Sequence, residues 1–379
     1  MSTLNRTDTS LIGKWWWTVD RWTLSALALL LAFGGVMTLA ASPAVAERID
    51  VGSFYFVKRQ AVFLCLAALT ILGVSLLSPK GVRRFALVIT LGALVFMVGT
   101  LLVGSEIKGA TRWLDFGIIS LQPSEFVKPG IAVVAAWLFA RRRMDETFPG
   151  FQMSIALYLV TVAILLLQPD VGMAFVVSVV WGTQFFIAGL PLVYVGMIGA
   201  IFVAAGVGAY FTFDHVQRRV DNFFGPDAEL GYQASRAIEA FQRGGVTGRG
   251  PGEGRVKEVL PDAHADFIFA VTGEEFGMLA CLFLVGLFAF VVLRGFGRVM
   301  KRDDLFVLLA VAGLLSQFAV QALINMASSV SLIPPKGMTL PFISYGGSSI
   351  VALALGMGMV LALTRERPSG SQAGGVYER

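Results

Sequence analysis

The sequence predicts an all-α polytopic membrane protein with ten transmembrane helices, both termini in the cytoplasm, and one long extracytoplasmic loop between spans seven and eight. Of its 379 residues, 56% are hydrophobic and only 15% are charged, a balance that soluble domains do not show. Apolar runs long enough to cross a bilayer recur along the chain. Because hydrocarbon offers no hydrogen-bond partners, each run is expected to satisfy its own backbone as a helix.

The apolar runs divide the chain into a cytoplasmic tail (1–22), one transmembrane domain (23–364) and a second cytoplasmic tail (365–379). The first run ends in "ASPAVAE", which resembles a signal-peptidase site. The run is longer than a typical signal sequence, so a retained first span is favoured over cleavage. The spans are expected near residues 23–42, 60–77, 86–103, 124–140, 151–167, 172–187, 191–211, 267–293, 305–325 and 343–364.

The positions of lysine and arginine predict the orientation. If the N-terminus is cytoplasmic, tight basic clusters such as Arg141–Arg143 fall in short inner loops. Half of the outer basic residues then lie in the long loop at 212–266, which the positive-inside rule discounts. That loop is polar and glycine-rich, and a loop of this length is usually functional or disordered.

Three carboxylates accompany the eighth span. Asp266 lies where the loop enters the span, so its side chain can reach water while its backbone is anchored, as a general base requires. The structural alternative is a helix N-cap, for which aspartate is also preferred. Glu274 and Glu275 lie deeper, where carboxylates either line a watery cleft or brace neighbouring segments; we favour bracing for at least one of them.

A second outer segment, Glu106–Gly130, gathers cations around an aromatic ring. Lys108, Arg112 and Lys128 could clamp a diphosphate, and Trp113 could carry a sugar. Glu125 lies three residues before Lys128, so the two would share a helix face if the fourth span starts near Pro123. The structural alternative is interfacial anchoring, because tryptophan, lysine and arginine all favour the headgroup region.

Two further outer segments are irregular. Asp170 lies in the tight turn "LLQPDVG", which its proline and glycine explain without any function. The segment Ser331–Ser349 contains Lys336, several prolines and paired glycines. Such breaks are tolerated at membrane depth only where protein or a water-filled cavity covers the backbone.

Taken together, these motifs resemble the shape, elongation, division and sporulation (SEDS) family of membrane glycosyltransferases, and "PDAHADF" is more like its division-type than its elongation-type members. The resemblance covers nearly the whole chain outside the tails. The matching motifs are Lys108-Gly109-Ala110-x-Arg112-Trp113, Gln122-Pro123-Ser124-Glu125-x-x-Lys128, Gln168-Pro169-Asp170-x-Gly172, Leu260-Pro261-x-Ala263-His264-x-Asp266-Phe267 with Glu274-Glu275-x-Gly277, and Pro341-Phe342-x-Ser344-Tyr345-Gly346-Gly347.

The resemblance implies a peptidoglycan glycosyltransferase that polymerises lipid II into glycan strands during division. It assigns Asp266 as the base that accepts the proton of the acceptor hydroxyl. Two departures from the family pattern are Ala265, where relatives often have threonine, and Asp262, where glutamate is commoner. The expected substrate-binding residues are Lys108, Arg112, Trp113, Glu125, Lys128, Asp170, Arg249, His264 and Lys336.

Cofactor and partner expectations follow from the same resemblance. No residue cluster demands a metal, although Mg²⁺ or Mn²⁺ could share the charge of the diphosphate. The expected partners are lipid II, undecaprenyl-diphosphate-linked glycan, membrane lipids, a class B penicillin-binding transpeptidase and other division proteins, with no nucleic acid. The expected location is the bacterial inner membrane at the division site. A lipid-linked precursor flippase, an elongation-type polymerase and a recruiting scaffold remain the alternatives.

Overall fold

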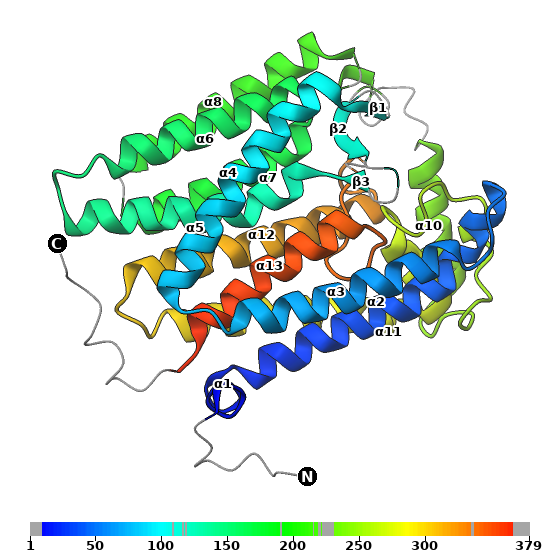
Figure 1. Ribbon diagram of the computed structural model, residues 1–379. Helices are drawn as coiled ribbons and strands as arrows, with labels where there is room; N and C mark the ends of the chain where they lie inside the picture. Colours follow the sequence, from blue (N-terminus) through cyan, green and yellow to red (C-terminus); the bar gives the residue numbers. More distant parts are fainter. Residues whose placement is uncertain are drawn as a thin grey trace.

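The long helices of the computed structural model form one elongated bundle, with a small sheet and a short helix at one end (Figure 1). The structure describes residues 10–107, 110–115, 117, 120–189, 192–214, 216–218, 221, 231–334 and 337–366. The long helices are α2 (Arg21–Arg48), α3 (Tyr55–Ser75), α4 (Pro79–Val103), α5 (Pro123–Met144), α6 (Gly150–Leu167), α7 (Val171–Ile187), α8 (Leu192–Thr212), α11 (Ile268–Val299), α12 (Leu305–Ser329) and α13 (Gly347–Thr364).

A helix covers each of the ten predicted spans, with small shifts at the ends. Within the described residues, seven helices are long and apolar enough to cross a membrane, namely α2, α3, α4, α6, α11, α12 and α13; α7 is apolar but shorter. The polytopic helical class is therefore confirmed, whereas ten crossings and the orientation stay predictions.

Local sequence explains where several helices begin. The side chains of Asp20, Ser78, Asp170 and Asp304 each accept a backbone amide at the start of the helix that follows. Such caps satisfy amides that the first helical turn leaves without partners. Pro79 adds a residue that suits the first turn of α4, because it has no amide hydrogen to satisfy.

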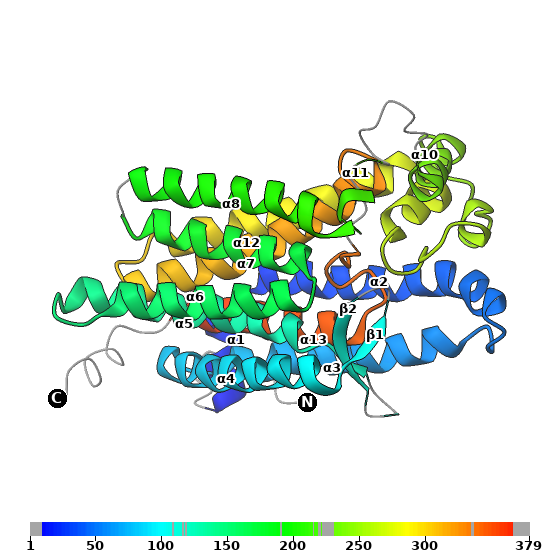
Figure 2. The same ribbon diagram turned by 90° about the horizontal axis from the view of Figure 1, so that it is seen from above.

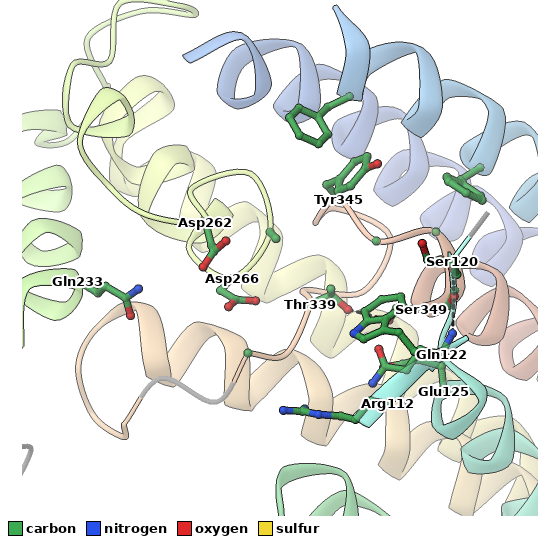
Figure 3. Close-up of a pocket in the computed structure, with 18 of the residues that line it drawn as sticks. Arg112, Ser120, Gln122, Glu125, Gln233, Asp262, Asp266, Thr339, Tyr345 and Ser349 are labelled. Atoms are coloured by element: carbon green, nitrogen blue, oxygen red, sulfur yellow. Dashed lines mark hydrogen bonds between the residues drawn. The ribbon is translucent and has the colours of Figure 1, made fainter. Parts of the chain in front are cut away.

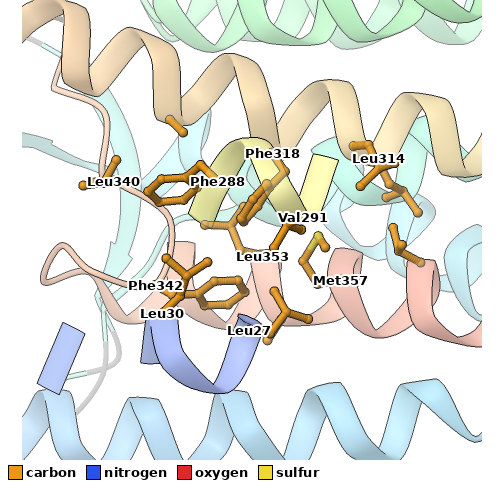
Figure 4. Packing of buried hydrophobic residues seen from close by; sticks show 14 of the residues in the cluster. Leu27, Leu30, Phe288, Val291, Leu314, Phe318, Leu340, Phe342, Leu353 and Met357 are labelled. Atoms are coloured by element: carbon orange, nitrogen blue, oxygen red, sulfur yellow. The ribbon is translucent and has the colours of Figure 1, made fainter. Parts of the chain in front are cut away.

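The core lies around α12 and α13, which pack against one another and against α5 and α11, while α3 covers α13 (Figure 2). Gly34 of α2 packs directly on the carbonyl of Phe342, so any side chain at that position would collide with backbone. Buried side chains from five segments interdigitate there, and Figure 4 shows Leu27, Leu30, Phe288, Val291, Leu314, Phe318, Leu340, Phe342, Leu353 and Met357.

Six elements among the described residues were not predicted: a short helix α1 (Leu11–Thr18), the three strands of an antiparallel sheet, and two helices within the long loop. The strands are β1 (Ser105–Ile107), β2 (Ala110–Asp115) and β3 (Ser120–Leu121), in the order β1-β2-β3. The loop contains α10 (Tyr232–Gly244) and the short 3-10 helix η1 (Val256–Glu258). The sheet and α10 lie at the same end of the bundle, on the right in Figure 1.

Helix α11 is broken near its start by Gly277, whose φ of 75° and ψ of −176° are not helical. The loop after α10 fills the break. The amides of Arg249 and Gly250 donate to the carbonyls of Glu274 and Glu275, at 3.0 and 2.9 Å. In return, the amide of Met278 donates to the carbonyl of Gly245, at 3.0 Å. The loop is thereby joined to the segment that carries Asp266.

Candidate active site

A cavity of about 920 Å³ opens at the end of the bundle that carries the sheet and α10. Its walls come from α3, β2, the start of α5, the loop before α11 and the loop between α12 and α13. Figure 3 shows Asp262 and Asp266 on one side, Arg112 and Glu125 on the other, and Thr339 between them. Carboxylates and a cation therefore share one chamber.

Asp266 lines this cavity, and its backbone is held from two directions. The amide of Asp266 donates to the carbonyl of Asp262, whose φ of 51° turns the chain just before α11. The side-chain amide of Asn325 on α12 donates to the Asp266 carbonyl at 2.9 Å and to the Met338 carbonyl at 2.7 Å. Asn325 thus fixes the segment of the predicted base against the loop after α12.

The capping alternative for Asp266 is wrong, because the N-cap position of α11 belongs to Phe267. The carboxylate instead lies beside the loop after α12: a Cβ added to Gly337 would lie 3.7 Å from Oδ2 of Asp266. Gly337 has a φ of 66°, a left-handed conformation that strains other residues. Lys336, the next residue along this loop, lies outside the described residues, as does Lys108.

Arg112 and Trp113 of β2, which the sequence offered as a cation and an aromatic platform for the substrate, both line the cavity. Arg112 forms an ion pair with Asp170, with 3.1 Å between Nη1 and Oδ2. Asp170 is buried behind Arg112 and is not among the lining residues. Burial raises the pKa of Asp170, and the positive charge of Arg112 opposes that rise. Asp170 therefore acts on the chamber through Arg112.

Glu125 lines the cavity, but Lys128 does not. The two form the predicted pair on one face of α5, with 2.8 Å between Nζ and Oε2. Lys128 is only 1% exposed, and its ammonium also donates to Oε1 of Gln321 at 2.9 Å. Gln321 in turn donates to Oγ1 of Thr339 and to Oγ of Ser349, both at 3.2 Å. Lys128 therefore holds Glu125 and the wall of the cavity.

Two other predicted substrate contacts lie away from the chamber. His264 is buried with its ring beside those of Phe56 and Tyr345, at centroid distances of 4.8 and 5.2 Å, and it is not among the lining residues. Arg249 is exposed and is also absent from the lining. Its backbone amide serves to join the loop to α11.

Sequence reasoning missed Arg59, a second cation that lines the cavity. It lies in the first turns of α3, and its Nη1 donates to the hydroxyl of Tyr55 at 2.8 Å. The available signal was the pair Lys58-Arg59 placed at the start of an apolar run. A charge at a span boundary has an ordinary interfacial explanation, so the residue did not stand out.

Glu274 and Glu275 both brace the loop before α11. Oε1 of Glu274 accepts the backbone amides of Arg255 and Val256, at 2.9 and 3.0 Å. Glu275 pairs with Nζ of Lys257 at 2.5 Å, and its other oxygen accepts the amide of Gly252 at 2.9 Å. The bracing explanation is confirmed for both acids.

The side chains that could bind a metal ion are His, Cys, Asp and Glu. In the part of the chain that the structure describes, no three His, Cys, Asp or Glu side chains gather into a group that could hold an ion. Asp262 and Asp266 are the acids nearest one another in the cavity wall. Two carboxylates without further protein ligands suit a cation only if the substrate supplies oxygens as well.

Comparison with known proteins gives consistent results. Residues 21–369 match the family described as cell cycle protein, which groups FtsW, RodA and SpoVE. The chain is 46% identical over 373 residues to the probable peptidoglycan glycosyltransferase FtsW of Caulobacter vibrioides, covering 98% of this chain and 96% of that protein. A protein with the same description from Trichlorobacter lovleyi is 32% identical over 351 residues, covering 90% and 92%.

Two solved structures share the fold at full length. One, from work on the structural coordination of polymerization and crosslinking by a peptidoglycan synthase complex, has a TM-score of 0.72 and 26% identity, covering 91% of this chain and 97% of that one. The other is the rod shape determining protein RodA of Thermus thermophilus, with a TM-score of 0.66 and 26% identity, covering 91% and 96%.

Proposed function

Because the chain belongs to the cell cycle protein family of FtsW, RodA and SpoVE, we propose that its cavity joins two lipid-linked sugars, with Asp266 as the base. The chain is a peptidoglycan glycosyltransferase of the FtsW type. Its substrate is lipid II, and its product is a glycan strand that remains attached to undecaprenyl diphosphate. The observation that carries the proposal is the placement of Asp266 and Arg112 in the walls of one chamber.

The bond-forming step requires a base on the acceptor. The carboxylate of Asp266 takes the proton from the 4-hydroxyl of the acceptor sugar as that oxygen attacks the anomeric carbon of the donor. A base must lie within hydrogen-bond reach of its proton in a fixed geometry. The contacts of Asn325 and the turn at Asp262 supply that rigidity by holding the backbone on both sides. Inversion from an α-linked donor to a β-linked product is what membership of the family implies.

The bond-breaking step requires positive charge. The bond between the anomeric carbon and the diphosphate oxygen breaks, and its electron pair leaves with the diphosphate. A diphosphate is a stable anion, so no acid has to protonate it, in contrast to the leaving group of a glycosidase. Fixed cations stabilise such developing charge. Arg112 and Arg59 line the cavity and take this role, whereas Asp170 holds Arg112 in position.

Lys128 has a supporting role in this proposal. Its ammonium is buried between Glu125 and Gln321, so it orients Glu125 in the cavity wall without contacting the leaving group. A divalent cation carried by the substrate diphosphate would neutralise further charge beside Asp262 and Asp266. The chemistry above is complete without it.

The proposed setting is the outer face of the bacterial inner membrane during division. The chain would work beside a class B penicillin-binding transpeptidase, which crosslinks the strands that the chain makes. Support comes from the solved relative described as part of a complex that coordinates polymerization and crosslinking. The orientation follows from the basic inner loops, since short loops rich in arginine favour the cytoplasm.

The test uses purified chain with lipid II in liposomes, with and without a cognate transpeptidase. Gel-resolved glycan strands measure polymerisation, and reagent access to the lipid II headgroup measures flipping. Polymer formation that depends on the chain supports the proposal. Headgroup translocation without polymer, in either preparation, would favour a flippase.

A further inference from the structure

The end of the bundle opposite the cavity carries two groups of arginines that differ in how their charge is neutralised. The first group belongs to α11. Arg294 makes a bidentate contact with Asp20, with two nitrogen–oxygen distances of 2.8 Å. Arg298 pairs with Asp20 at 3.5 Å and with Glu366 at 2.8 Å. Each of these arginines therefore has a carboxylate partner within the protein.

The second group, here called the α4–α5 arginine cluster, consists of Arg83 and Arg84 in the second turn of α4 and Arg141, Arg142 and Arg143 at the end of α5. The two helices pack against one another. Arg83 lies over the ring of Trp137, 5.3 Å from its centroid. Arg141 and Arg142 lie over Phe148 and Phe151, each at 5.9 Å. Aromatic rings thus hold three of the five guanidinium groups.

No acid in the described part of the chain pairs with this cluster. None of the five arginines forms an ion pair or a side-chain hydrogen bond with a described residue. Arg83 instead experiences the positive charges of Arg84 and Arg141. The carboxylate of Asp145, which follows α5, accepts the amide and hydroxyl of Thr147, and the charge of Arg141 acts on it without forming an ion pair. Arg83 and Arg84 lie at the N-terminal end of α4, where the helix dipole adds positive potential, whereas Arg141, Arg142 and Arg143 lie at the C-terminal end of α5, where the dipole favours cations.

The surroundings of the cluster indicate the kind of anion that would suit it. Leu87 and Val88, one turn further along α4, are exposed, and so is Met144 at the end of α5. Exposed apolar side chains beside a row of arginines match a phospholipid, whose acyl chains and phosphate are joined in one molecule. Guanidinium groups bind phosphate through paired hydrogen bonds.

We propose that the α4–α5 arginine cluster is a binding site for the phosphate of an anionic phospholipid from the surrounding leaflet. Basic pockets between transmembrane helices on the cytoplasmic side bind such headgroups in other proteins. Membrane orientation by itself calls for positive charge at this end, but it does not account for the aromatic rings under three guanidinium groups. The site is separate from the cavity and does not depend on the function proposed for it.

The test is a titration of the detergent-purified full chain with dioctanoyl phosphatidylglycerol, followed by microscale thermophoresis. The variant Arg83→Gln/Arg141→Gln/Arg142→Gln should bind at least about tenfold more weakly, because each basic residue near an anionic headgroup contributes about fivefold in affinity. The matched control Lys14→Gln/Lys58→Gln/Lys301→Gln removes the same charge from exposed positions elsewhere and should stay within about twofold of the native affinity. Polymerisation of lipid II in detergent should be unchanged in the cluster variant, which also verifies its folding.

The native chain provides a second measurement that needs no variant. It should bind dioctanoyl phosphatidylglycerol in preference to dioctanoyl phosphatidylcholine, and neither inorganic phosphate nor polyglutamate should compete at equal charge concentration. Equal affinity for the two lipids would overturn the proposal, as would equal losses in the cluster and control variants. Competition by phosphate would assign the cluster to free anions, and competition by polyglutamate would assign it to an acidic protein.

Discussion

Asn325 and Asp266 are joined by a hydrogen bond of 2.9 Å, from the side-chain amide of Asn325 to the backbone carbonyl of Asp266. The same amide donates to Met338 at 2.7 Å, so one side chain on α12 connects the two loops that flank the proposed base. Asn325 does not line the cavity. It is therefore a positioning residue whose effect on the reaction passes through the backbone of Asp266.

Replacement of Asn325 by leucine should lower kcat while changing KM little. Leucine has a similar size but no donor, so the buried bond to Met338 and the partly buried bond to Asp266 are both lost, and an unpaired buried carbonyl costs about 1–3 kcal/mol. Steady-state kinetics on lipid II should show a loss of roughly tenfold or more in kcat, since small misplacements of a catalytic group are expensive. The control Ser328→Ala, on the same helix, removes a hydroxyl that bonds only to the carbonyl of Ile324. Native kcat in Asn325→Leu would show that the bond does not position the base.

The buried pair of Glu125 and Lys128 gives a prediction about stability. Lys128→Met leaves Glu125 without its cation, and breaking a buried pair in this way costs about 3–5 kcal/mol. The double variant Lys128→Met/Glu125→Gln removes both charges and should recover much of that loss, although it should remain poorly active because Glu125 lines the cavity. Free energies of unfolding from SDS titration would measure both effects. A double variant less stable than the single one would contradict a role in orienting Glu125.

The ion pair between Lys257 and Glu275 should hold the loop at 244–258 on α11. Lys257→Met leaves a buried carboxylate unpaired, and breaking such a pair costs about 3–5 kcal/mol. The amides of Gly252 and Val256, which bond to Glu275 and Glu274, should then exchange hydrogen at least about tenfold faster. The control Arg243→Gln removes an exposed cation of α10 and should leave that exchange unchanged. Unaltered protection in Lys257→Met would mean that the backbone contacts alone hold the loop.

The lowered pKa of Asp20 makes the free energy of unfolding depend on pH. Burial alone would raise its pKa, but the hydrogen bonds from Arg294 and Thr23 outweigh burial and hold the pKa below the ordinary value of 3.8. A lowered pKa in the folded state stabilises the protein above the unfolded-state pKa, and this contribution is lost as the pH falls through the folded-state pKa. Asp20→Asn should therefore be less stable by about 3 kcal/mol at pH 7. Melting temperatures measured down to pH 3 should show the difference shrinking below about pH 4; a constant difference would exclude this titration.

The sequence was sufficient to predict the features that depend on local composition. Apolar runs of spanning length located each long helix, and the spacing of Glu125 and Lys128 placed them on one face of α5, where they pair. The helix predictions succeed because helix length and helical periodicity follow from neighbouring residues alone. The resemblance to the SEDS family, rather than any local pattern, assigned Asp266 and Arg112 to one site, and both line the cavity.

The remaining features depend on contacts between distant segments. Lys128 does not reach the cavity because its ammonium donates a hydrogen bond to Gln321, which lies 193 residues further along the chain. The braces on Glu274 and Glu275 need a loop that turns back to a break in α11, and that break depends on the backbone conformation of Gly277. Arg59 enters the cavity because α3 packs beside α13. Contacts between residues so far apart in the sequence cannot be predicted from the pattern of neighbouring residues.

The most direct measurement compares Asp266→Asn with Asp262→Asn in lipid II polymerisation, because the two carboxylates share the cavity wall. Asparagine keeps the size of the side chain but cannot accept the proton of the acceptor hydroxyl. The account predicts no detectable glycan strands from Asp266→Asn at a native melting temperature, and strands from Asp262→Asn. Strand formation near the native rate by a folded Asp266→Asn variant would contradict it.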